Sequence, residues 1–417
     1  MADKQKVATI RDGWKVLIAG LCINLTIGML YSWSVIKKAL VEEWGWTNSD
    51  ASLPYTTAIV VWAIALLFAG RLQDRIGPRK VITLGVVLGA TGLMLSGLIH
   101  NVFPLMVTFG VLAGTGIGFA YSSVTPPVLK WFHPSKKGMV TGIVVSGLGV
   151  ASIYIAPLTT HLLHSYGISG AFVILGGFML VVGLPIAQLI NNPPADYVPP
   201  QPSNGIPVNP ATSVQGINAG WKQMIRTRQF YFLWIMFAFA SSAGLMIIGN
   251  LATIAKSQAG MEKGFYLVAI LALFNAAGRL AAGWLSDKIG RPYTFVIVFA
   301  LQGINMLLFA GYHTELSMTV GTALAGIGYG ALLSLFPSII ADYYGLKNFG
   351  GNYGILYTAW GVSGTIGPII AGYVVDKTGT YDQAYLISAV LLAVAFILAL
   401  MIKPVTALPL KTVSEPA

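Results

Sequence analysis

Charged residues are scarce in this sequence. Of its 417 residues only 9% are Asp, Glu, Lys or Arg, while 55% are hydrophobic and the mean hydropathy is +0.73. About a quarter of the residues of an ordinary soluble domain are charged, so this deficit excludes a protein whose whole surface faces water. Cysteine occurs only once, as Cys22, which excludes an intrachain disulfide framework and a cysteine-based zinc cluster.

Long apolar runs stand where the charges are missing. Runs of about 20 residues, enough to cross a hydrocarbon core of about 30 Å as a helix, recur along the chain. We predict twelve spans: 14–36, 53–70, 80–100, 104–129, 138–163, 170–190, 229–252, 264–285, 293–312, 317–341, 350–374 and 382–402. The sequence therefore predicts an all-α membrane protein with twelve transmembrane helices. The first run is too long and too polar for a cleaved signal, so we expect it to be a span.

The basic residues are unevenly distributed between the two sides of the predicted spans. If the N-terminus is inside, 19 of the 25 Lys and Arg fall on that side and five on the other, and Arg279 is the remaining one. This positive-inside bias predicts a multi-pass protein of the cell (inner, cytoplasmic) membrane with both termini in the cytoplasm. It also accounts for the net charge of +11 without a nucleic-acid partner.

A proline-rich stretch separates six predicted spans from the other six. Residues 191–210 contain seven prolines, a composition typical of an extended linker. The segment after it, with Trp221, Lys222 and Arg226, predicts a short amphipathic helix on the cytoplasmic surface. We expect an N-terminal bundle (1–190), a linker (191–228), a C-terminal bundle (229–403) and a cytoplasmic tail (404–417).

The two halves repeat one another. "GRLQDRIGPRK" (70–80) and "GWLSDKIGRP" (283–292) share the pattern Gly-x-x-x-Asp-Arg/Lys-Ile-Gly at an offset of 213 residues, and "AGTGIG" (113–118) matches "AGIGYG" (325–330) at 212. The acids of this corner can cap helix N-termini, and the glycines allow tight turns. We predict a cytoplasmic gate built from Gly70, Asp74, Arg75, Gly77, Gly283, Asp287, Lys288 and Gly290.

With this repeated corner the sequence resembles the major facilitator superfamily, and the resemblance covers nearly the whole chain. It implies two pseudo-symmetric six-helix bundles around a central cavity that opens alternately to either side.

One arginine lies inside an apolar span. Arg279 is about 12 Å from Asp287 along a helix, at about 1.5 Å per residue, which places it near the bilayer midplane. A charge there costs at least about 2.5 kcal/mol. A structural arginine would be satisfied by a carboxylate or by carbonyls, but all 14 acidic residues fall in tails, loops or helix ends. We therefore interpret the missing counter-ion as an anionic substrate with one carboxylate.

Polar and aromatic residues at similar depth could complete a substrate site. Asn275 lies one helical turn before Arg279 on the same face. The other candidates are Asn24 in the first span, Tyr121 in the fourth, Tyr329 in the tenth, and Tyr357 and Trp360 in the eleventh. Each tyrosine alone could equally be a packing residue between helices, whereas its spacing ties Asn275 to Arg279.

Within the superfamily, two motifs are similar to those of the monocarboxylate transporters, the lactate/proton symporters. "RDGWKVL" (11–17) resembles the entry to their first span, and "KWFHPSKKGMVTGIVVSGLG" (130–149) resembles their span-five signature. The resemblance implies that Arg279 is the substrate arginine. The sequence departs from these transporters at Asn275, where they carry an aspartate linked to proton coupling, and at Val35, where they carry a lysine.

The eighth and eleventh spans also resemble those of the oxalate:formate antiporters. "LFNAAGR" (273–279) and "NYGILYTAW" (352–360) carry this similarity. Trp360 replaces the lysine that would bind a second carboxylate, which argues against dicarboxylate exchange.

These observations predict a secondary transporter rather than an enzyme. The expected substrate is a small monocarboxylate, L-lactate or pyruvate, carried with a proton by a monomer that needs no cofactor or metal. Because Asn275 cannot titrate near neutral pH, the proton could be carried by the substrate itself or by Lys37, Lys38 or Asp376. The alternatives are a uniporter, an oxalate- or formate-type exchanger and a sensor that binds the anion without moving it.

Overall fold

The fold is described from a computed structural model that covers residues 9–47, 50–200, 218–261 and 265–405. Within these ranges the regular structure is helical throughout, and no strand is found. The elements of the first half are, in chain order, α1 (Ile10–Thr26), η1 (Gly28–Ser32), α2 (Trp33–Trp44), η2 (Asp50–Ser52), α3 (Leu53–Ile76), α4 (Pro78–Ser96), α5 (Val102–Leu105), η3 (Met106–Ala113), α6 (Gly114–Trp131), η4 (Pro134–Lys136) and α7 (Lys137–Ala187).

The second half begins after the linker. Its elements are α8 (Trp221–Met224), α9 (Arg228–Ala259), α10 (Phe265–Ile289), α11 (Arg291–Phe309), α12 (Glu315–Tyr344), α13 (Phe349–Leu356), α14 (Thr358–Thr378) and α15 (Asp382–Met401).

Each predicted apolar run lies mainly on helix, which confirms the expected all-α fold. Nine helices of the described residues are long and apolar enough to cross a membrane. One of them, α7, is two helices joined at Gly167, whose φ of 69° breaks the helical path. The first predicted span is divided between α1 and α2, and the eleventh between α13 and α14. Side chains such as Phe103 and Leu316, each 74% exposed, cover the outside of this apolar body.

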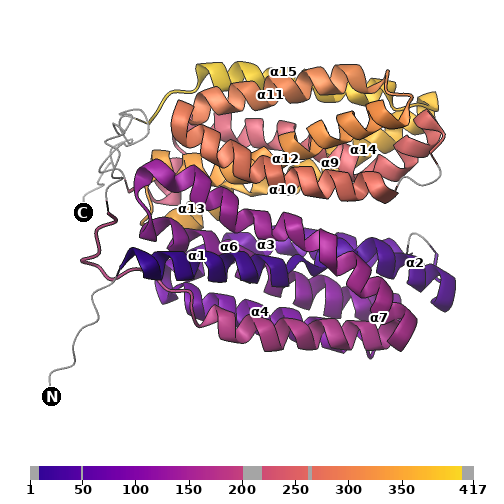
Figure 1. Cartoon of the computed structure of the whole chain (residues 1–417), viewed down its shortest axis with the longest axis horizontal. Coiled ribbons are helices and arrows are strands. Elements are labelled where there is room, and N and C mark those ends of the chain that lie inside the picture. Colours follow the sequence, from indigo (N-terminus) through magenta and orange to yellow (C-terminus); the bar gives the residue numbers. More distant parts are fainter. Residues whose placement is uncertain (1–8, 48–49, 201–217, 262–264, 406–417) are drawn as a thin grey trace, which may run out of the picture.

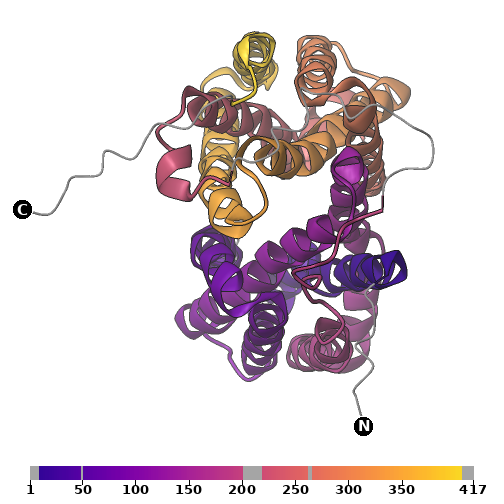
Figure 2. The same cartoon turned by 90° about the vertical axis from the view of Figure 1, so that its left-hand side faces the viewer.

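The helices form two bundles that lie side by side along their long axes (Figure 1). One bundle contains α1 to α7 and the other α9 to α15. Both described chain ends lie at the same end of the molecule, called here the termini end, and Figure 2 looks onto it. The described part of the linker, 191–200 and 218–220, also runs at this end, while residues 201–217 and the tail beyond residue 405 lie outside the described residues. The predicted domain boundaries therefore stay a prediction.

The first helix begins with a local carboxylate cap. The backbone N–H of Thr9 donates to Oδ2 of Asp12 at 3.1 Å, and Nζ of Lys15 donates to Oδ1 at 3.0 Å. The hydrogen bonds from Lys15 and from Thr9 together lower the pKa of Asp12 to about 2. The cap thus stays ionised, and its negative charge lies at the helix N-terminus, where the helix dipole favours it.

Two helix pairs bring the bundles into contact: α7 with α10, and α3 with α13. Each pair meets at glycines. A Cβ added at Gly283 would collide with the backbone of Gly138, and a Cβ added at Gly70 would collide with the backbone of Gly350. The two contacts correspond to one another under the sequence repeat, so the duplicated glycines serve the same close approach in both halves.

Candidate functional site

Arg279 lies on α10 at the contact with α7 and is fully buried. Its Nε donates to Oδ1 of Asn275 at 2.8 Å, across one helical turn as the spacing predicts. Its Nη1 donates to the backbone carbonyl of Val145 on α7. Its Nη2 has no hydrogen-bond partner within the described part of the chain. The guanidinium is therefore held at two points and retains donors that the described residues do not use.

No described carboxylate neutralises this charge. The five ion pairs formed among the described residues all join other side chains. Carbonyl and amide oxygens orient Arg279, but they carry no net charge to balance a guanidinium in an apolar surrounding. An anionic group would thus be favoured beside the guanidinium.

Glycines on α7 make room for this arginine. A Cβ at Gly142 would run into the backbone carbonyl of Arg279, whereas a Cβ at Gly149 would lie 3.5 Å from its Cζ, which is ordinary contact. In the other helix pair, a Cβ added at Gly354 on α13 would likewise collide with the backbone carbonyl of Leu66 on α3. Under the repeat, Leu66 is the counterpart of Arg279, so the charge is present on one side of the pseudo-symmetric pair only.

Asn24 is on α1 and binds the same stretch of α7. Its Nδ2 donates to the carbonyl of Val144 at 2.8 Å, one residue before the carbonyl that Arg279 uses. Its Oδ1 has no hydrogen-bond partner among the described residues. The structure thus connects Asn24 to α7 rather than directly to Arg279.

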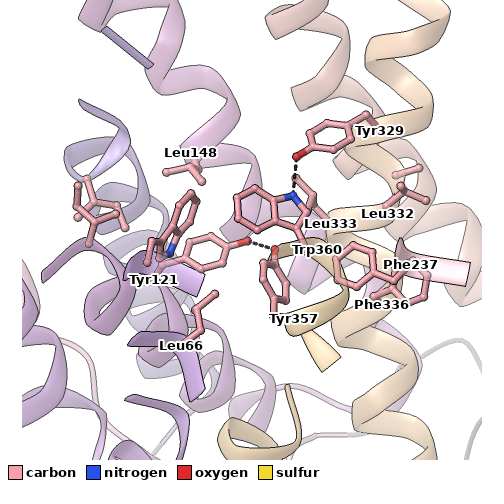
Figure 3. Packing of buried hydrophobic residues seen from close by; sticks show 14 of the residues in the cluster. Leu66, Tyr121, Leu148, Phe237, Tyr329, Leu332, Leu333, Phe336, Tyr357 and Trp360 are labelled. Carbon is pink, nitrogen blue, oxygen red and sulfur yellow. Dashed lines mark hydrogen bonds between the residues drawn. The ribbon is translucent and has the colours of Figure 1, made fainter. Parts of the chain in front are cut away.

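The four aromatic candidates form one cluster between the halves (Figure 3). The hydroxyls of Tyr121 on α6 and Tyr357, between α13 and α14, are 2.8 Å apart, which joins the two bundles by a hydrogen bond. Nε1 of Trp360 donates to the hydroxyl of Tyr329 at 2.8 Å. All four side chains are buried. In this conformation the cluster fills the centre of the molecule.

Two further residues belong to this cluster and were not among the predicted site residues. The ring of Trp62 on α3 lies 5.5 Å from that of Tyr121 and 5.1 Å from that of Trp360. The ring of Tyr353 lies 4.8 Å from that of Tyr357. A signal for both was present in the sequence: Trp62 stands 213 residues before Asn275, and Tyr353 stands one helical turn before Tyr357.

The repeated acids bind helix starts of the opposite half. Asp74 on α3 accepts from the backbone N–H of Gly351 at 3.0 Å, at the beginning of α13. Asp287 on α10 accepts from Gly138 at 2.8 Å and Met139 at 2.7 Å, at the beginning of α7. The expected capping is therefore present, and both caps connect the two bundles at the termini end.

The other predicted gate residues take different positions. Gly77 and Gly290 have φ of 90° and 94°, which is the left-handed geometry that the tight turn requires. Arg75 is exposed. Nζ of Lys288 lies 3.9 Å from the ring centroid of Trp284 on its own helix. The connection between the halves is thus made by the two acids and the glycine contacts, not by Arg75 or Lys288.

A buried ion network reinforces one of the two caps. Asp342 on α12 binds Nζ of Lys137 at 3.0 Å and Nε of Arg291 at 2.9 Å, and Arg291 also binds Asp287 at 2.7 Å. The four side chains are at most 10% exposed. At the Asp74 cap the repeat puts Phe349 in place of Lys137, so the corresponding ion pair cannot form. Of the two caps that close the termini end, the Asp287 cap is thus supported by an ion network, and the Asp74 cap lacks the corresponding ion pair.

The two lysines among the predicted proton-coupling residues lie away from the arginine. Lys37 and Lys38 are on α2, at the end opposite the termini (Figure 1). Lys38 is 73% exposed and lies 3.7 Å from Glu42. Asp376 is on α14, but its side chain is outside the described residues. None of the described contacts connects these lysines to Arg279.

Arg279 and the aromatic cluster do not open onto the groove found between the halves. This groove, of about 650 Å³, lies between α3 and α14 and is lined mainly by apolar side chains from Tyr55 to Leu67 and from Thr358 to Gly364. Neither Arg279 nor the four clustered aromatics line it. Because Arg279 and the four aromatic side chains are at most 7% exposed, a ligand could reach them only after the helices move.

Comparison with known proteins identifies the family. The model of the Major Facilitator Superfamily matches residues 16–291 and 247–416. Relatives include the uncharacterized MFS-type transporter YhjX of Escherichia coli, which is 29% identical and aligned over 84% of this chain and 86% of its own. The oxalate:formate antiporter of Oxalobacter formigenes is 26% identical over 98% and 95%, and monocarboxylate transporter 11 of Mus musculus is 27% identical over 92% and 86%.

Solved structures show the same fold at low sequence identity. The human organic anion transporter MFSD10 superposes with a TM-score of 0.71 at 15% identity, over 94% of this chain and all of that one. The fucose:proton symporter FucP of E. coli gives 0.70 at 16% identity, over 93% and 99%. These relatives and neighbours are transporters, not enzymes.

Proposed function

The chain belongs to the Major Facilitator Superfamily, and on this premise we propose that it carries a small monocarboxylate, L-lactate or pyruvate, across the cell membrane together with a proton. The observation that supports this most strongly is Arg279, a buried guanidinium without a carboxylate partner among the described residues. The relatives named as monocarboxylate transporters support this substrate class.

Arg279 has enough donors for a carboxylate. A guanidinium has five N–H groups, of which one binds Asn275 and one binds the carbonyl of Val145. The remaining donors, including both on Nη2, can bind the two oxygens of one carboxylate as a planar fork. One guanidinium balances one negative charge, which favours a monocarboxylate over a dicarboxylate.

The aromatic cluster supports a site that opens and closes. Tyr121 and Tyr357 belong to different halves, so their hydrogen bond must break when the halves separate. An anion between them would provide acceptors for both hydroxyls. Movement at the centre would thus be linked to binding, as alternating access requires.

The closed termini end supports an assignment of the conformation. If both termini are cytoplasmic, as the distribution of Lys and Arg predicts, the caps by Asp74 and Asp287 and the pair between Lys137 and Asp342 close the cytoplasmic side. Opening to the cytoplasm must break all three contacts. The proposed transport cycle therefore alternates between a state in which these three contacts are formed and a state in which they are broken.

Proton coupling requires a carrier other than an acid beside the arginine. Asn275 occupies that position and cannot titrate near neutral pH, and Lys37 and Lys38 are on α2, at the end of the molecule opposite the termini. The simplest arrangement is that the proton travels with the substrate. Uptake measured with and without an imposed pH gradient tests symport, because a uniporter of the carboxylate anion would not accumulate substrate in response to the gradient.

Anion exchange is the second candidate, because the oxalate:formate antiporter is aligned over nearly the whole chain. Trp360 takes the place of that family's second cation, and its indole is bound to Tyr329. Counterflow tests exchange directly. If Arg279 alone balances the charge of the substrate, the site accepts one carboxylate, and labelled oxalate should not exchange with unlabelled formate.

The primary test is uptake of labelled L-lactate into proteoliposomes that contain the wild type or Arg279→Gln. We expect the variant to lose at least about 90% of uptake, since one charge-assisted bond is worth roughly 1.5–3 kcal/mol. Arg226→Gln is the matched control, because Arg226 is exposed. Both variants should keep the elution profile of the folded protein. Unchanged uptake by folded Arg279→Gln would refute the proposed function.

A further inference from the structure

The groove between α3 and α14 opens onto the outer surface of the helices. It is lined mainly by apolar side chains, and three of them, Val60, Ile64 and Val362, are 51%, 49% and 39% exposed. The α3 side of the groove lies within a candidate membrane span, Asp50–Ile76. In a membrane, the medium that this groove faces is the hydrocarbon of the lipids rather than water. The group available to fill it is therefore an acyl chain.

The length of the groove is comparable to the depth of one lipid leaflet. Along α3 its lining runs from Tyr55 to Leu67, which is about 18 Å at about 1.5 Å per residue. Half of a hydrocarbon core of about 30 Å is about 15 Å. One acyl chain of a phospholipid can therefore lie along this face of α3, with the headgroup at one end of the groove.

A positively charged side chain lies in line with the groove, on the side of the termini end. Arg71 is four residues after Leu67, one turn further along the same face of α3, at a distance of about 6 Å along the axis. Its Nε is buried and has no hydrogen-bond partner in the described part of the chain. The five ion pairs formed among the described residues do not include it. An anion is therefore favoured beside Arg71.

The residues around Arg71 add a second cation. Cζ of Arg71 lies 4.6 Å from the ring centroid of Trp221, and Nζ of Lys222 lies 5.6 Å from the centroid of the same ring. The nearby acid on α3, Asp74, is bound to the backbone N–H of Gly351 instead. Basic pockets between membrane helices bind the headgroups of acidic phospholipids on the cytoplasmic side, which is the predicted side of the termini end. The charge of this pocket thus complements such a headgroup.

We propose that Arg71 and the groove between α3 and α14 form a binding site for one anionic phospholipid, with the phosphate bound by Arg71 and one acyl chain in the groove. The inference does not depend on the transported substrate, because neither Arg279 nor the four clustered aromatics line the groove. Since α3 and α14 belong to different halves, the bound lipid contacts both, and its affinity depends on their relative position.

The test titrates the purified protein in detergent with dioleoyl phosphatidylglycerol and follows the melting temperature. A ligand that binds the folded state stabilises it once its concentration exceeds the dissociation constant, so the titration gives an apparent affinity. We expect saturable stabilisation, with at least about tenfold weaker affinity for dioleoyl phosphatidylcholine and for glycerol 3-phosphate. Equal affinity for phosphatidylcholine overturns the role of the charge. Equal affinity for glycerol 3-phosphate shows a phosphate site and overturns the lipid assignment.

Arg71→Gln tests the headgroup contact. The variant should bind phosphatidylglycerol at least about tenfold more weakly, as the loss of one charge-assisted hydrogen bond implies. Arg79→Gln is the matched control, because it removes the same charge from an exposed arginine at the start of α4, also at the termini end. Its affinity should stay within about twofold of the wild type. Equal losses in both variants would mean unspecific attraction to a basic surface and would overturn the site.

Gly364→Leu tests the groove. Gly364 lines the groove on α14, and the nearest described atom to a Cβ added there is Cδ1 of Leu245 at 4.0 Å, which leaves room for a side chain. The variant should keep the melting temperature of the lipid-free wild type. It should bind dioleoyl phosphatidylglycerol about tenfold more weakly, because the added side chain competes with the acyl chain for space. A folded variant that binds this lipid as tightly as the wild type overturns the placement of the acyl chain in the groove.

Discussion

Nη1 of Arg279 donates to the backbone carbonyl of Val145, so a charged side chain of one bundle is bound to a helix of the other. The same guanidinium binds Asn275 on its own helix and has no carboxylate partner within the described residues. Because α7 and α10 belong to different halves, any ligand that competes for this guanidinium acts on the interface that must move.

The contact of α7 with α10 predicts that two glycine substitutions on α7 differ in their effect on stability and uptake. Gly142→Ala puts a methyl group into the backbone of Arg279, which cannot shift without moving α10, whereas Gly149→Ala adds only ordinary contacts at 3.5 Å. We expect Gly142→Ala to lower the melting temperature and to abolish most uptake. Gly149→Ala should retain uptake within about twofold. Equal tolerance of both variants would contradict this packing.

The hydrogen bond between Tyr121 and Tyr357 predicts non-additive effects. Each Tyr→Phe substitution removes the same bond, so the double variant should lose little more than either single one. The coupling expected for one buried bond is about 0.5–1.5 kcal/mol. A double-mutant cycle on thermal stability measures it. Strictly additive losses would show that the hydroxyls do not stabilise the closed cluster through each other.

The ion network at the termini end predicts unequal costs for its members. Asp342→Asn leaves Lys137 and Arg291 with one carboxylate between them, whereas Lys137→Met leaves Asp342 paired with Arg291. Loss of one partner from a buried network costs roughly 3–5 kcal/mol, so Asp342→Asn should melt at the lower temperature. Spin labels on the two halves should also report more opening at this end. A greater effect of Lys137→Met would contradict the assigned pairing.

The contact between Asn275 and Arg279 predicts a pH-dependent variant. In Asn275→Asp a carboxylate would lie beside the guanidinium and compete with the substrate when it is ionised. Substrate binding should therefore be weak above the pKa of the new carboxyl group and recover as the pH falls through it. Affinity measured from pH 4 to pH 8 gives the profile. An Asn275→Asp variant whose affinity follows the wild type at every pH would count against this geometry.

The sequence was sufficient to predict the helical membrane fold because hydrocarbon imposes a length and a composition on every span. It also predicted the contact of Asn275 with Arg279, since residues four apart share a helix face. It could not predict that Arg279 binds Val145, or that Asp74 and Asp287 cap helices of the opposite half, because these contacts join residues more than 130 positions apart. Trp62 and Tyr353 were missed because each, taken alone, is an ordinary apolar-span aromatic.

The most direct test measures whether the counter-ion of Arg279 comes from solution. Calorimetric titration of the purified protein with L-lactate and with its neutral amide, lactamide, compares two ligands that differ in charge. The wild type should bind L-lactate at least about 100-fold more tightly than lactamide, and folded Arg279→Gln should lose most of that preference. If Arg279→Gln still prefers the anion by the same factor, the buried guanidinium is not its binding site.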